Sequence, residues 1–354
     1  MVRRTVRRPH SADHEKRPRQ RRHLPIVNCI TALTHDTATG VRPLSLPVYG
    51  KPVGPSRVQV NLNLTFKKSQ KTNDPKPMAE CHSLPQYSKA IVREIPDSIR
   101  DNSEAFKWKK RRSKDIIDLC KAREDHARYT QALRDLGLDV TVIPADEATP
   151  DCPFVEDTCV VVGNRALVTR PADKARRKEV DCVEKLLADL GLEVNRIKEK
   201  GATLEGGDAI FTGKEFFVGD STQSNKAGRE ILAETFPDYP VFSIPVEPPE
   251  FHLKGLVCCA GPGIIAVGNH KAGRKAWEII RKSSKHSYEA LWVPDYDGLN
   301  CIHVNGTIIH CREDEWPNSC KTFAEKLMGF GRVELSVGEL KKVDAALSCC
   351  SVLF

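Results

Sequence analysis

The chain repeats one local pattern four times, and the length of this repeat limits the folds that the chain can adopt. In each repeat two apolar segments flank a glycine turn, and successive turn glycines are 50, 48 and 45 residues apart. These glycines are Gly163, Gly213, Gly261 and Gly306. A repeat of this length is typical of supersecondary units that stack in an array or form a closed ring. An ordinary α/β sheet with coincidental spacing is the alternative interpretation.

Each glycine turn lies in a predicted unit of four elements. A strand begins the unit, a two-stranded hairpin follows, and an amphipathic helix with apolar residues at helical spacing completes it. The hairpins are expected at residues 158–170, 209–219, 256–268 and 301–311. The preceding strands are expected at 140–144, 192–197, 239–245 and 290–294, and the helices at 178–190, 225–236, 271–282 and 320–330.

A fifth unit is divided between the two ends of the regular region. It begins with the strand-like segment 332–337 and stops at SCCSVLF (348–354), before a second hairpin strand. The segment 89–95 can supply the missing strand, and this pairing would remove exposed sheet edges. We therefore predict an α/β fold, a five-bladed α/β-propeller of ββαβ-type repeats that is closed by pairing of the N- and C-terminal strands.

Residues 1–80 differ from the rest of the chain in charge and composition. They carry 16 Lys and Arg against 5 Asp and Glu, and nine of the 23 prolines, whereas the remaining residues are slightly acidic in sum. We predict a basic, disordered extension over residues 1–80 and one catalytic domain over residues 81–354. Met78, at the boundary, is a candidate alternative start. Nucleic-acid binding would fall to the basic extension and is not expected of the folded domain.

Composition also excludes several classes of protein. No apolar stretch approaches the ~18 residues of a membrane span, and no apolar segment follows the arginine-rich N-terminus as it would in a signal peptide. The 13 cysteines include no C-x-x-C and no zinc-type Cys/His quartet. We therefore expect a cytoplasmic protein without membrane attachment, whose cysteines are reduced thiols.

Ring symmetry predicts where functional side chains meet, because residues just before each inner strand would converge on the axis. Those positions hold Asp151, Glu156, Asp157, Glu205, Asp208, His252, Cys349 and Cys350. Carboxylates without metal-ligand spacing suit a guanidinium, which pairs through two parallel N–H···O bonds. A thiol beside that cation would have a lowered pKa, and a histidine can transfer protons near neutral pH. An ordinary histidine and a small core cysteine are the alternatives at this point.

Five segments together resemble the dimethylarginine dimethylaminohydrolase family. They are DCPFVED (151–157), ALVTRP (166–171), TLEGGDAIFTGKEFFVG (203–219), FHLKG (251–255) and KKVDAALSCCSVLF (341–354). The resemblance extends over residues 87–354 in order. This family belongs to the pentein, or guanidine-modifying, superfamily of α/β-propellers, which agrees with the five predicted units.

The resemblance implies a role for each matching residue. Cys349 would be the nucleophile, His252 the general acid and base, and Glu205 the group that orients His252. The implied substrate contacts are Asp151, Glu156 and Asp157 to the guanidinium, Arg170 to the carboxylate, the Val343 carbonyl to the α-amino group, and Phe106 as an aromatic lid.

The implied reaction is hydrolysis of asymmetric dimethylarginine or monomethylarginine to citrulline and dimethylamine or methylamine. The Cys349 thiolate would attack the guanidinium carbon, His252 would protonate the leaving amine, and water would hydrolyse the covalent thiouronium. No cofactor or metal is required, although Cys349 and His252 could together hold an inhibitory zinc ion. The implied partner is a small guanidine, and no oligomeric state is indicated.

One motif departs from the family pattern. After FFVG the family resembles S-K-R-T-N, whose Arg would contact the substrate carboxylate, whereas this chain has Gln223 at that position. Losing a charge-assisted bond costs about 1.5–3 kcal/mol. The alternatives are therefore a deiminase or hydrolase of another guanidine such as agmatine, and a catalytically weak regulatory homologue.

The division of the chain predicts that residues 1–80 are dispensable for catalysis. A shortened chain that begins at Met78 should keep the kcat of the full chain, because the extension lacks the repeat pattern. Steady-state kinetics on both proteins would check this. A large loss of kcat in the shortened chain would contradict the division.

Overall fold

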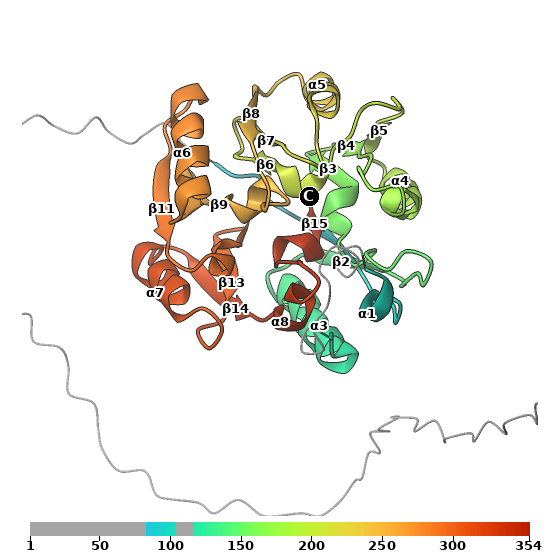
Figure 1. Ribbon diagram of the computed structural model, residues 1–354, viewed down its shortest axis with the longest axis horizontal. Coiled ribbons are helices and arrows are strands. Elements are labelled where there is room, and N and C mark those ends of the chain that lie inside the picture. The colour runs from blue at the N-terminus through green and yellow to red at the C-terminus, as the bar shows by residue number, and fades with distance from the viewer. Residues whose placement is uncertain (1–82, 104–115) are drawn as a thin grey trace, which may run out of the picture. The chain divides into compact units, whose positions relative to one another are not determined.

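The computed structural model describes residues 83–103 and 116–354. The predictions for residues 1–80 and for Phe106 lie outside these ranges. Within them the chain forms an α/β fold with five three-stranded sheets. Figure 1 shows the longer helices around the outside of the molecule and the strands toward its centre.

Four of the sheets are each continuous in sequence and share one design. Two strands form an antiparallel hairpin, and a third strand pairs in parallel with the second strand of that hairpin. Their strands are β3 (Cys159–Val162), β4 (Arg165–Val168) and β5 (Glu193–Arg196); β6 (Ala209–Phe211), β7 (Phe216–Asp220) and β8 (Val241–Pro245); β9 (Val257–Gly261), β10 (Ile264–Gly268) and β11 (Glu289–Val293); and β12 (Ile302–Val304), β13 (Thr307–Cys311) and β14 (Gly331–Leu335). The four predicted hairpins are confirmed, and the segments expected between them do form strands. The predicted grouping is wrong, because each hairpin pairs with the strand that follows its helix and not with the strand that precedes the hairpin.

The fifth sheet joins the two ends of the described chain. Strand β15 (Val352–Leu353) pairs antiparallel with β1 (Lys89–Arg93), and β1 pairs in parallel with β2 (Asp139–Ile143). The predicted pairing of the N- and C-terminal strands is therefore present. Among the described residues, every ladder lies within one of the five sheets, so no backbone ladder joins one sheet to the next.

The four predicted helices are present, and one long helix was not predicted. The helices are α1 (Ile99–Asn102), α3 (Leu119–Asp135), α4 (Glu179–Asp189), α5 (Lys226–Thr235), α6 (Lys271–Ser283), α7 (Pro317–Lys326) and α8 (Gly338–Lys341). Helix α3 was missed because most of its residues are polar, and only a narrow stripe that includes Ala122, Tyr129 and Leu133 is buried. Helix α7 begins earlier than predicted, at Pro317, which the first turn of a helix tolerates.

The hairpin turns require glycine, but at one of them the predicted residue is wrong. Gly163, Gly213 and Gly306 have φ values of 59°, 82° and 88°, a region that other residues seldom adopt. In the third hairpin Gly263, with φ of 72°, takes this conformation instead of Gly261. Gly261 ends strand β9, and a Cβ atom there would lie 3.1 Å from the Phe330 ring.

A short 3-10 turn precedes the first strand of each of the four continuous sheets and strand β15 of the fifth sheet. These turns are η2 (Val155–Thr158), η4 (Gly206–Asp208), η5 (Leu253–Gly255), η6 (Asp297–Leu299) and η7 (Ser348–Cys350). Turn η2 contacts both η7 and η4, and η4 contacts η5. Segments that are far apart in the sequence therefore meet beside one another, as the convergence argument predicts.

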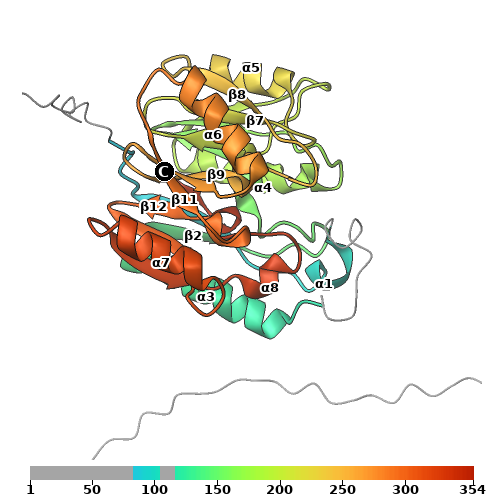
Figure 2. The same cartoon turned by 60° about the vertical axis from the view of Figure 1, so that its left-hand side comes forward.

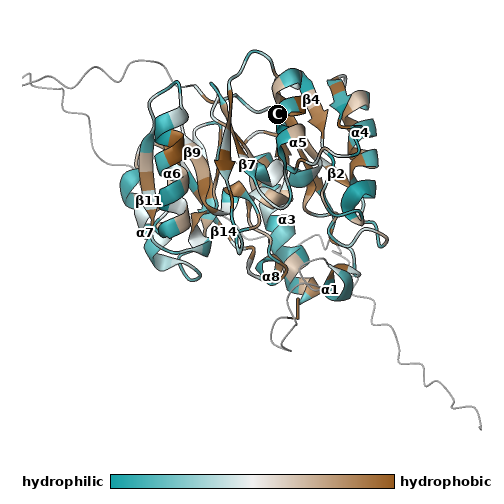
Figure 3. Cartoon of the chain, turned by 45° about the horizontal axis from the view of Figure 1, so that its top comes forward, coloured by the Kyte–Doolittle hydropathy of each residue, from teal (hydrophilic) through white to brown (hydrophobic). Residues whose placement is uncertain are grey.

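The sheets are buried because the helices cover them. In Figure 3 the apolar residues concentrate on strands such as β4, β7 and β9, and the outer surfaces of the helices are mostly hydrophilic. Helices α3 and α8 contact each other, and Figure 2 shows them together with α7 on one side of the molecule. Of the helices in the described ranges, none combines the length and apolar character that a membrane crossing requires.

The fifth sheet allows a matched test of burial. Val92 on β1 and Val142 on β2 are register partners, and their side chains are 0% and 39% exposed, respectively. Val92→Ala should lower the free energy of unfolding by roughly 2–3 kcal/mol, because it removes two buried methyl groups and leaves a cavity. Val142→Ala should change it by less than about 1 kcal/mol.

Urea denaturation of both variants would provide the measurement. Equal losses of stability would show that the sheet buries these two positions to the same degree, in contradiction of the fold.

Candidate active site

The converging turns position the candidate catalytic side chains. His252 and Glu205 are the residues immediately before η5 and η4, where the backbone is extended. Asp157 lies within η2, and Cys349 lies within η7. The short turns thus bring side chains from four parts of the sequence to one place.

Cys349, His252 and Glu156 line one pocket of about 750 Å³, together with Lys254 and Ser348. Its other polar lining residues are Glu250, Tyr296, Asp297, Asn300, Lys341, Lys342 and Asp344. The pocket is therefore rich in charges of both signs. A volume of several hundred Å³ is sufficient for a small-molecule ligand.

A carboxylate holds His252 in place. The His252 Nε2 and Glu205 Oε2 atoms are 2.8 Å apart, and Glu205 is 1% exposed. Burial disfavours the imidazolium, but the carboxylates of Asp157, Glu205 and Asp208 outweigh this effect and raise the pKa of His252 to about 10. His252 is consequently charged at neutral pH and can donate a proton.

A buried guanidinium of the chain itself neutralises part of the acidic cluster. Arg176 Nη1 is 2.8 Å from Asp157 Oδ2, and Arg176 Nη2 is 2.9 Å from Glu179 Oε2. Asp157 Oδ1 also accepts a 3.0 Å bond from the Gly207 backbone N–H. Burial opposes ionisation of Asp157, but His252 and Arg176 hold the pKa of Asp157 below its ordinary value. Asp157 therefore carries a negative charge beneath His252.

Glu156 has partners of a different kind. Its Oε1 accepts a 2.6 Å bond from Lys254 Nζ, and its Oε2 accepts a 2.9 Å bond from Ser348 Oγ. Asn300 Oδ1 accepts a 2.9 Å bond from the backbone N–H of Ser348. This network fixes Glu156 in the pocket beside Cys349. A cationic ligand that binds Glu156 would therefore meet Lys254 as a competitor for the carboxylate.

The two adjacent cysteines have different environments. Cys349 lines the pocket and its Sγ accepts a 3.4 Å contact from the Ala346 N–H, whereas Cys350 is 0% exposed and packs in an apolar cluster. Burial, followed by the carboxylates of Glu156 and Asp157, raises the pKa of Cys349 well above its ordinary value. Both residues lie in a 3-10 turn and not on a strand, so strand alternation is not the reason for their different directions.

Three other predicted site residues are buried near the pocket, and each has a different environment. Asp151 is buried, and its carbonyl oxygen lies 3.5 Å from Arg176 Nη2. Val343 is buried in the core between the pocket-lining residues Lys342 and Asp344. Asp208 does not line the pocket. It accepts bonds from the Leu253 N–H and the Ser221 hydroxyl, so it holds the turn that follows His252.

Two residues that were considered as contacts of the substrate's carboxylate do not line the pocket. Gln223 is partly buried, and its side-chain amide donates a 3.1 Å bond to Thr222 Oγ1. Arg170 donates a 3.1 Å bond to the Ala202 carbonyl and lines a separate cavity. Their contact with a substrate carboxylate stays a prediction.

Three residues of the charge network were not predicted from the sequence. Lys254 belongs to the FHLKG motif and Ser348 to the SCCS motif. Their closeness in the sequence to His252 and Cys349 was the signal from which they could have been predicted. Arg176 is one of two adjacent arginines, and Arg177 instead donates to the backbone carbonyls of Pro171 and Ala172. No pattern in the sequence separates the buried arginine of this pair from the other.

Asp157, Glu205 and His252 each place one potential ligand atom within 4.8 Å of the others. The cation of Arg176 already neutralises Asp157 and lies 3.9 Å from Glu205. A divalent ion at this place would therefore meet a neighbouring positive charge. The possible inhibitory zinc at Cys349 and His252 stays a prediction.

Comparison with known protein families places this site in context. A sequence model described as "N,N dimethylarginine dimethylhydrolase, eukaryotic" matches residues 96–271. The N(G),N(G)-dimethylarginine dimethylaminohydrolase of Pseudomonas aeruginosa is 28% identical over 242 residues, which are 67% of this chain and 90% of that protein. A crystal structure of the Pseudomonas aeruginosa enzyme, as a cysteine-to-serine mutant complexed with citrulline, superposes with a TM-score of 0.64 at 25% identity. The match covers 76% of this chain and all of that one (100%).

A human protein named "Putative hydrolase DDAH2" is 37% identical over 279 residues. The match covers 76% of this chain and 95% of the human protein. At this identity and coverage, the chain belongs to the dimethylarginine dimethylaminohydrolase family.

Proposed function

We propose that the chain hydrolyses a substituted guanidine at Cys349, with methylated arginine as its substrate and citrulline as a product. The observation that supports this most is the shared pocket of Cys349, His252 and Glu156, in which Glu205 bonds His252 at 2.8 Å. A nucleophile, a charged proton donor and a carboxylate for a cation are all accessible from one cavity. This combination suits nucleophilic attack on the carbon of a planar cation, with protonation of the amine that leaves.

In the proposed reaction the Cys349 thiolate bonds to the guanidinium carbon and gives a tetrahedral intermediate. His252 donates its proton to the departing methylamine or dimethylamine, the C–N bond breaks, and an S-alkylthiouronium forms on Cys349. The neutral His252 then takes a proton from water, whose oxygen attacks the same carbon. The C–S bond breaks, Cys349 leaves as the thiolate, and citrulline is released.

The charges around Cys349 make substrate binding part of its activation. In the free protein, burial and two carboxylates keep Cys349 as a neutral thiol. A guanidinium at Glu156 adds a positive charge next to the thiol and therefore favours the thiolate, whose proton is released to solvent because His252 is already protonated. Neutral molecules of similar shape would leave the thiol protonated and would not react.

We further propose that the five sheets surround one axis as a five-bladed propeller. Contacts between β9 and β12, between β6 and β9, and between β15 and β3 support this arrangement. The 3-10 turns would then lie at one end of the axis, with the catalytic side chains among them.

The second candidate function is hydrolysis or deimination of a decarboxylated guanidine such as agmatine. It is favoured by Gln223, which is uncharged and lies outside the residues that line the pocket. A catalytically silent regulatory protein is the third candidate, and the set Cys349, His252 and Glu205 disfavours it.

One panel of substrates and two variants would test the proposed function. The full chain should release citrulline from asymmetric dimethylarginine and monomethylarginine. Cys349→Ser should reduce kcat by at least about 10³-fold, since it removes the nucleophile. Cys350→Ser is the matched control and should retain most of the activity, because Cys350 packs in the core.

Turnover of agmatine without turnover of methylarginines would favour the second candidate, and no turnover of any guanidine would favour the third. Activity that survives in Cys349→Ser and disappears in a folded Cys350→Ser would contradict the assignment of the nucleophile.

The lining of the pocket also predicts which positively charged side chain binds the α-carboxylate of an amino-acid substrate. Lys341 lines the pocket beside its ion-pair partner Asp297, whereas Gln223 lies outside the lining residues. Lys341→Met should raise KM for monomethylarginine about tenfold and change kcat little, because the carboxylate is remote from the reacting carbon.

Agmatine, which lacks the carboxylate, should be unaffected by Lys341→Met, and Lys326→Met on the exposed face of α7 is the control variant. If Gln223→Arg lowers the KM for monomethylarginine while Lys341→Met has no effect, the carboxylate binds at position 223 and this assignment is wrong.

A further inference from the structure

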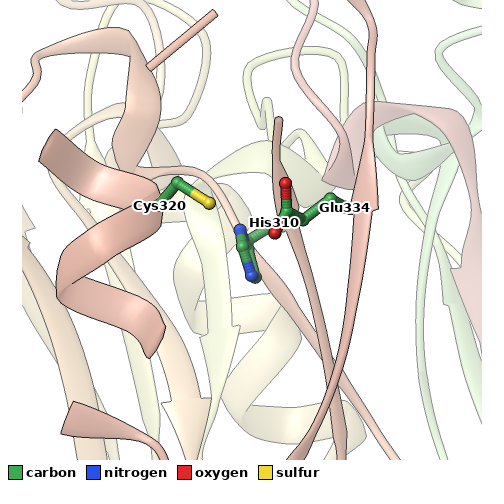
Figure 4. Close-up of side chains that lie close together, drawn as sticks. All are labelled: His310, Cys320 and Glu334. Carbon is green, nitrogen blue, oxygen red and sulfur yellow. The ribbon is translucent and has the colours of Figure 1, made fainter. Parts of the chain in front are cut away.

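A second cluster of chemically reactive side chains lies under helix α7, and the proposed reaction does not use it. Cys320 comes from α7, His310 from β13 and Glu334 from β14 (Figure 4). His310 and Glu334 are direct register partners on the two parallel strands. One ligand atom of each residue lies within 4.8 Å of the others. The fold thus brings an imidazole, a thiol and a carboxylate together from three elements.

One ring nitrogen of His310 has a hydrogen-bond partner and the other has none among the described residues. The His310 Nδ1 atom is 2.8 Å from the carbonyl oxygen of Cys311, so the ring proton belongs on Nδ1. The Nε2 atom has no hydrogen-bond partner among the described residues, and the whole side chain is buried, with 0% exposure. The ring stacks on Phe323 with 4.9 Å between the centroids. Metal-binding histidines commonly show this arrangement, with one ring nitrogen donating to a carbonyl.

An unpartnered buried nitrogen alone would not indicate a metal. His126 and His303 also contain such nitrogens. Within the described ranges, however, neither belongs to a group of three residues with metal-ligand atoms in close proximity. His310 is distinguished by the thiol and the carboxylate that lie close to its ring.

We propose that His310 Nε2, Cys320 Sγ and a carboxylate oxygen of Glu334 form a binding site for a divalent metal ion, with zinc as the preferred ion. Zinc is bound in proteins by imidazole, thiolate and carboxylate in tetrahedral geometry. One thiolate and one carboxylate balance its charge. Glu334 is exposed, so a water molecule can occupy the fourth position from the solvent side.

Small movements bring the ligands to bonding distance. Zinc bonds of about 2.0–2.3 Å in a tetrahedron place ligand atoms roughly 3.3–3.8 Å apart, and the ligand atoms of the present cluster all lie within 4.8 Å of one another. The exposed Glu334 side chain can make this adjustment. One of its oxygens accepts a 3.2 Å bond from the Glu313 N–H, which orients the carboxylate.

The thiol of Cys320 must lose its proton when the metal binds. Burial and the neighbouring Glu334 carboxylate raise the pKa of Cys320 to about 11, so the metal-free residue is a neutral thiol. Binding therefore releases one proton. The bound ion would link α7 to strands β13 and β14, outside the residues that line the pocket of Cys349.

Cobalt is a suitable probe because a cobalt–thiolate bond gives a charge-transfer band in the near-ultraviolet. The full chain with Cys349→Ser, stripped of metal by a chelator, removes competition from the catalytic thiol. This protein should bind Co²⁺ with the thiolate band and with the intense visible bands of tetrahedral cobalt, and Zn²⁺ should displace the Co²⁺. Adding Cys320→Ser should abolish the thiolate band.

Two further variants keep the test independent of folding. Glu334→Gln, at an exposed position, should retain the band but weaken Co²⁺ affinity at least tenfold. Cys120→Ser is the matched control for an exposed thiol and should change neither quantity. A thiolate band that persists in Cys320→Ser, unchanged affinity in Glu334→Gln, or no thiolate band in Cys349→Ser alone would each overturn the proposed site.

Discussion

The buried pairing of Asp157 with Arg176 and His252 is the interaction on which the rest of the active site depends. Asp157 is 2% exposed, lies 2.8 Å from Arg176 and bonds the Gly207 N–H at 3.0 Å. A buried carboxylate is costly unless cations and hydrogen bonds surround it. The same negative charge contributes to the raised pKa of His252. Removing either partner would leave an uncompensated charge beside His252, the proposed acid of the reaction.

The fold produces this arrangement by placing a tight turn before one edge strand of every sheet. Glycine is needed where these turns approach the site, since a Cβ atom on Gly207 would lie 2.6 Å from His252 Nδ1. A Cβ on Gly206 would lie 1.9 Å from the Glu156 carbonyl oxygen. The apolar strands supply the stability, and the turns supply the close approach of charged groups.

The repeat pattern predicted the hairpins, the strands between them and the use of β1 to complete the last sheet, but it assigned each separate strand to the hairpin that follows it instead of the one that precedes it. Periodicity could not reveal α3, because tertiary packing buries only a narrow stripe of that polar helix. Resemblance to a family pointed to Cys349, His252, Glu205, Glu156 and Asp157, and the structure brings these five together. It could not indicate that Lys254 and Arg176 neutralise the carboxylates, because partner choice depends on which long side chains turn inward.

The central claim is that a guanidinium in the pocket converts Cys349 from thiol to thiolate. The direct measurement is a pH titration of ultraviolet thiolate absorbance in the full chain, with and without a saturating guanidinium that is not hydrolysed, with Cys349→Ser subtracted as background. The account predicts a high pKa for Cys349 in the free protein and a fall of at least one pH unit on binding, since each unit corresponds to about 1.4 kcal/mol of favourable charge interaction. An unchanged titration curve, with the ligand shown to be bound, would contradict the account.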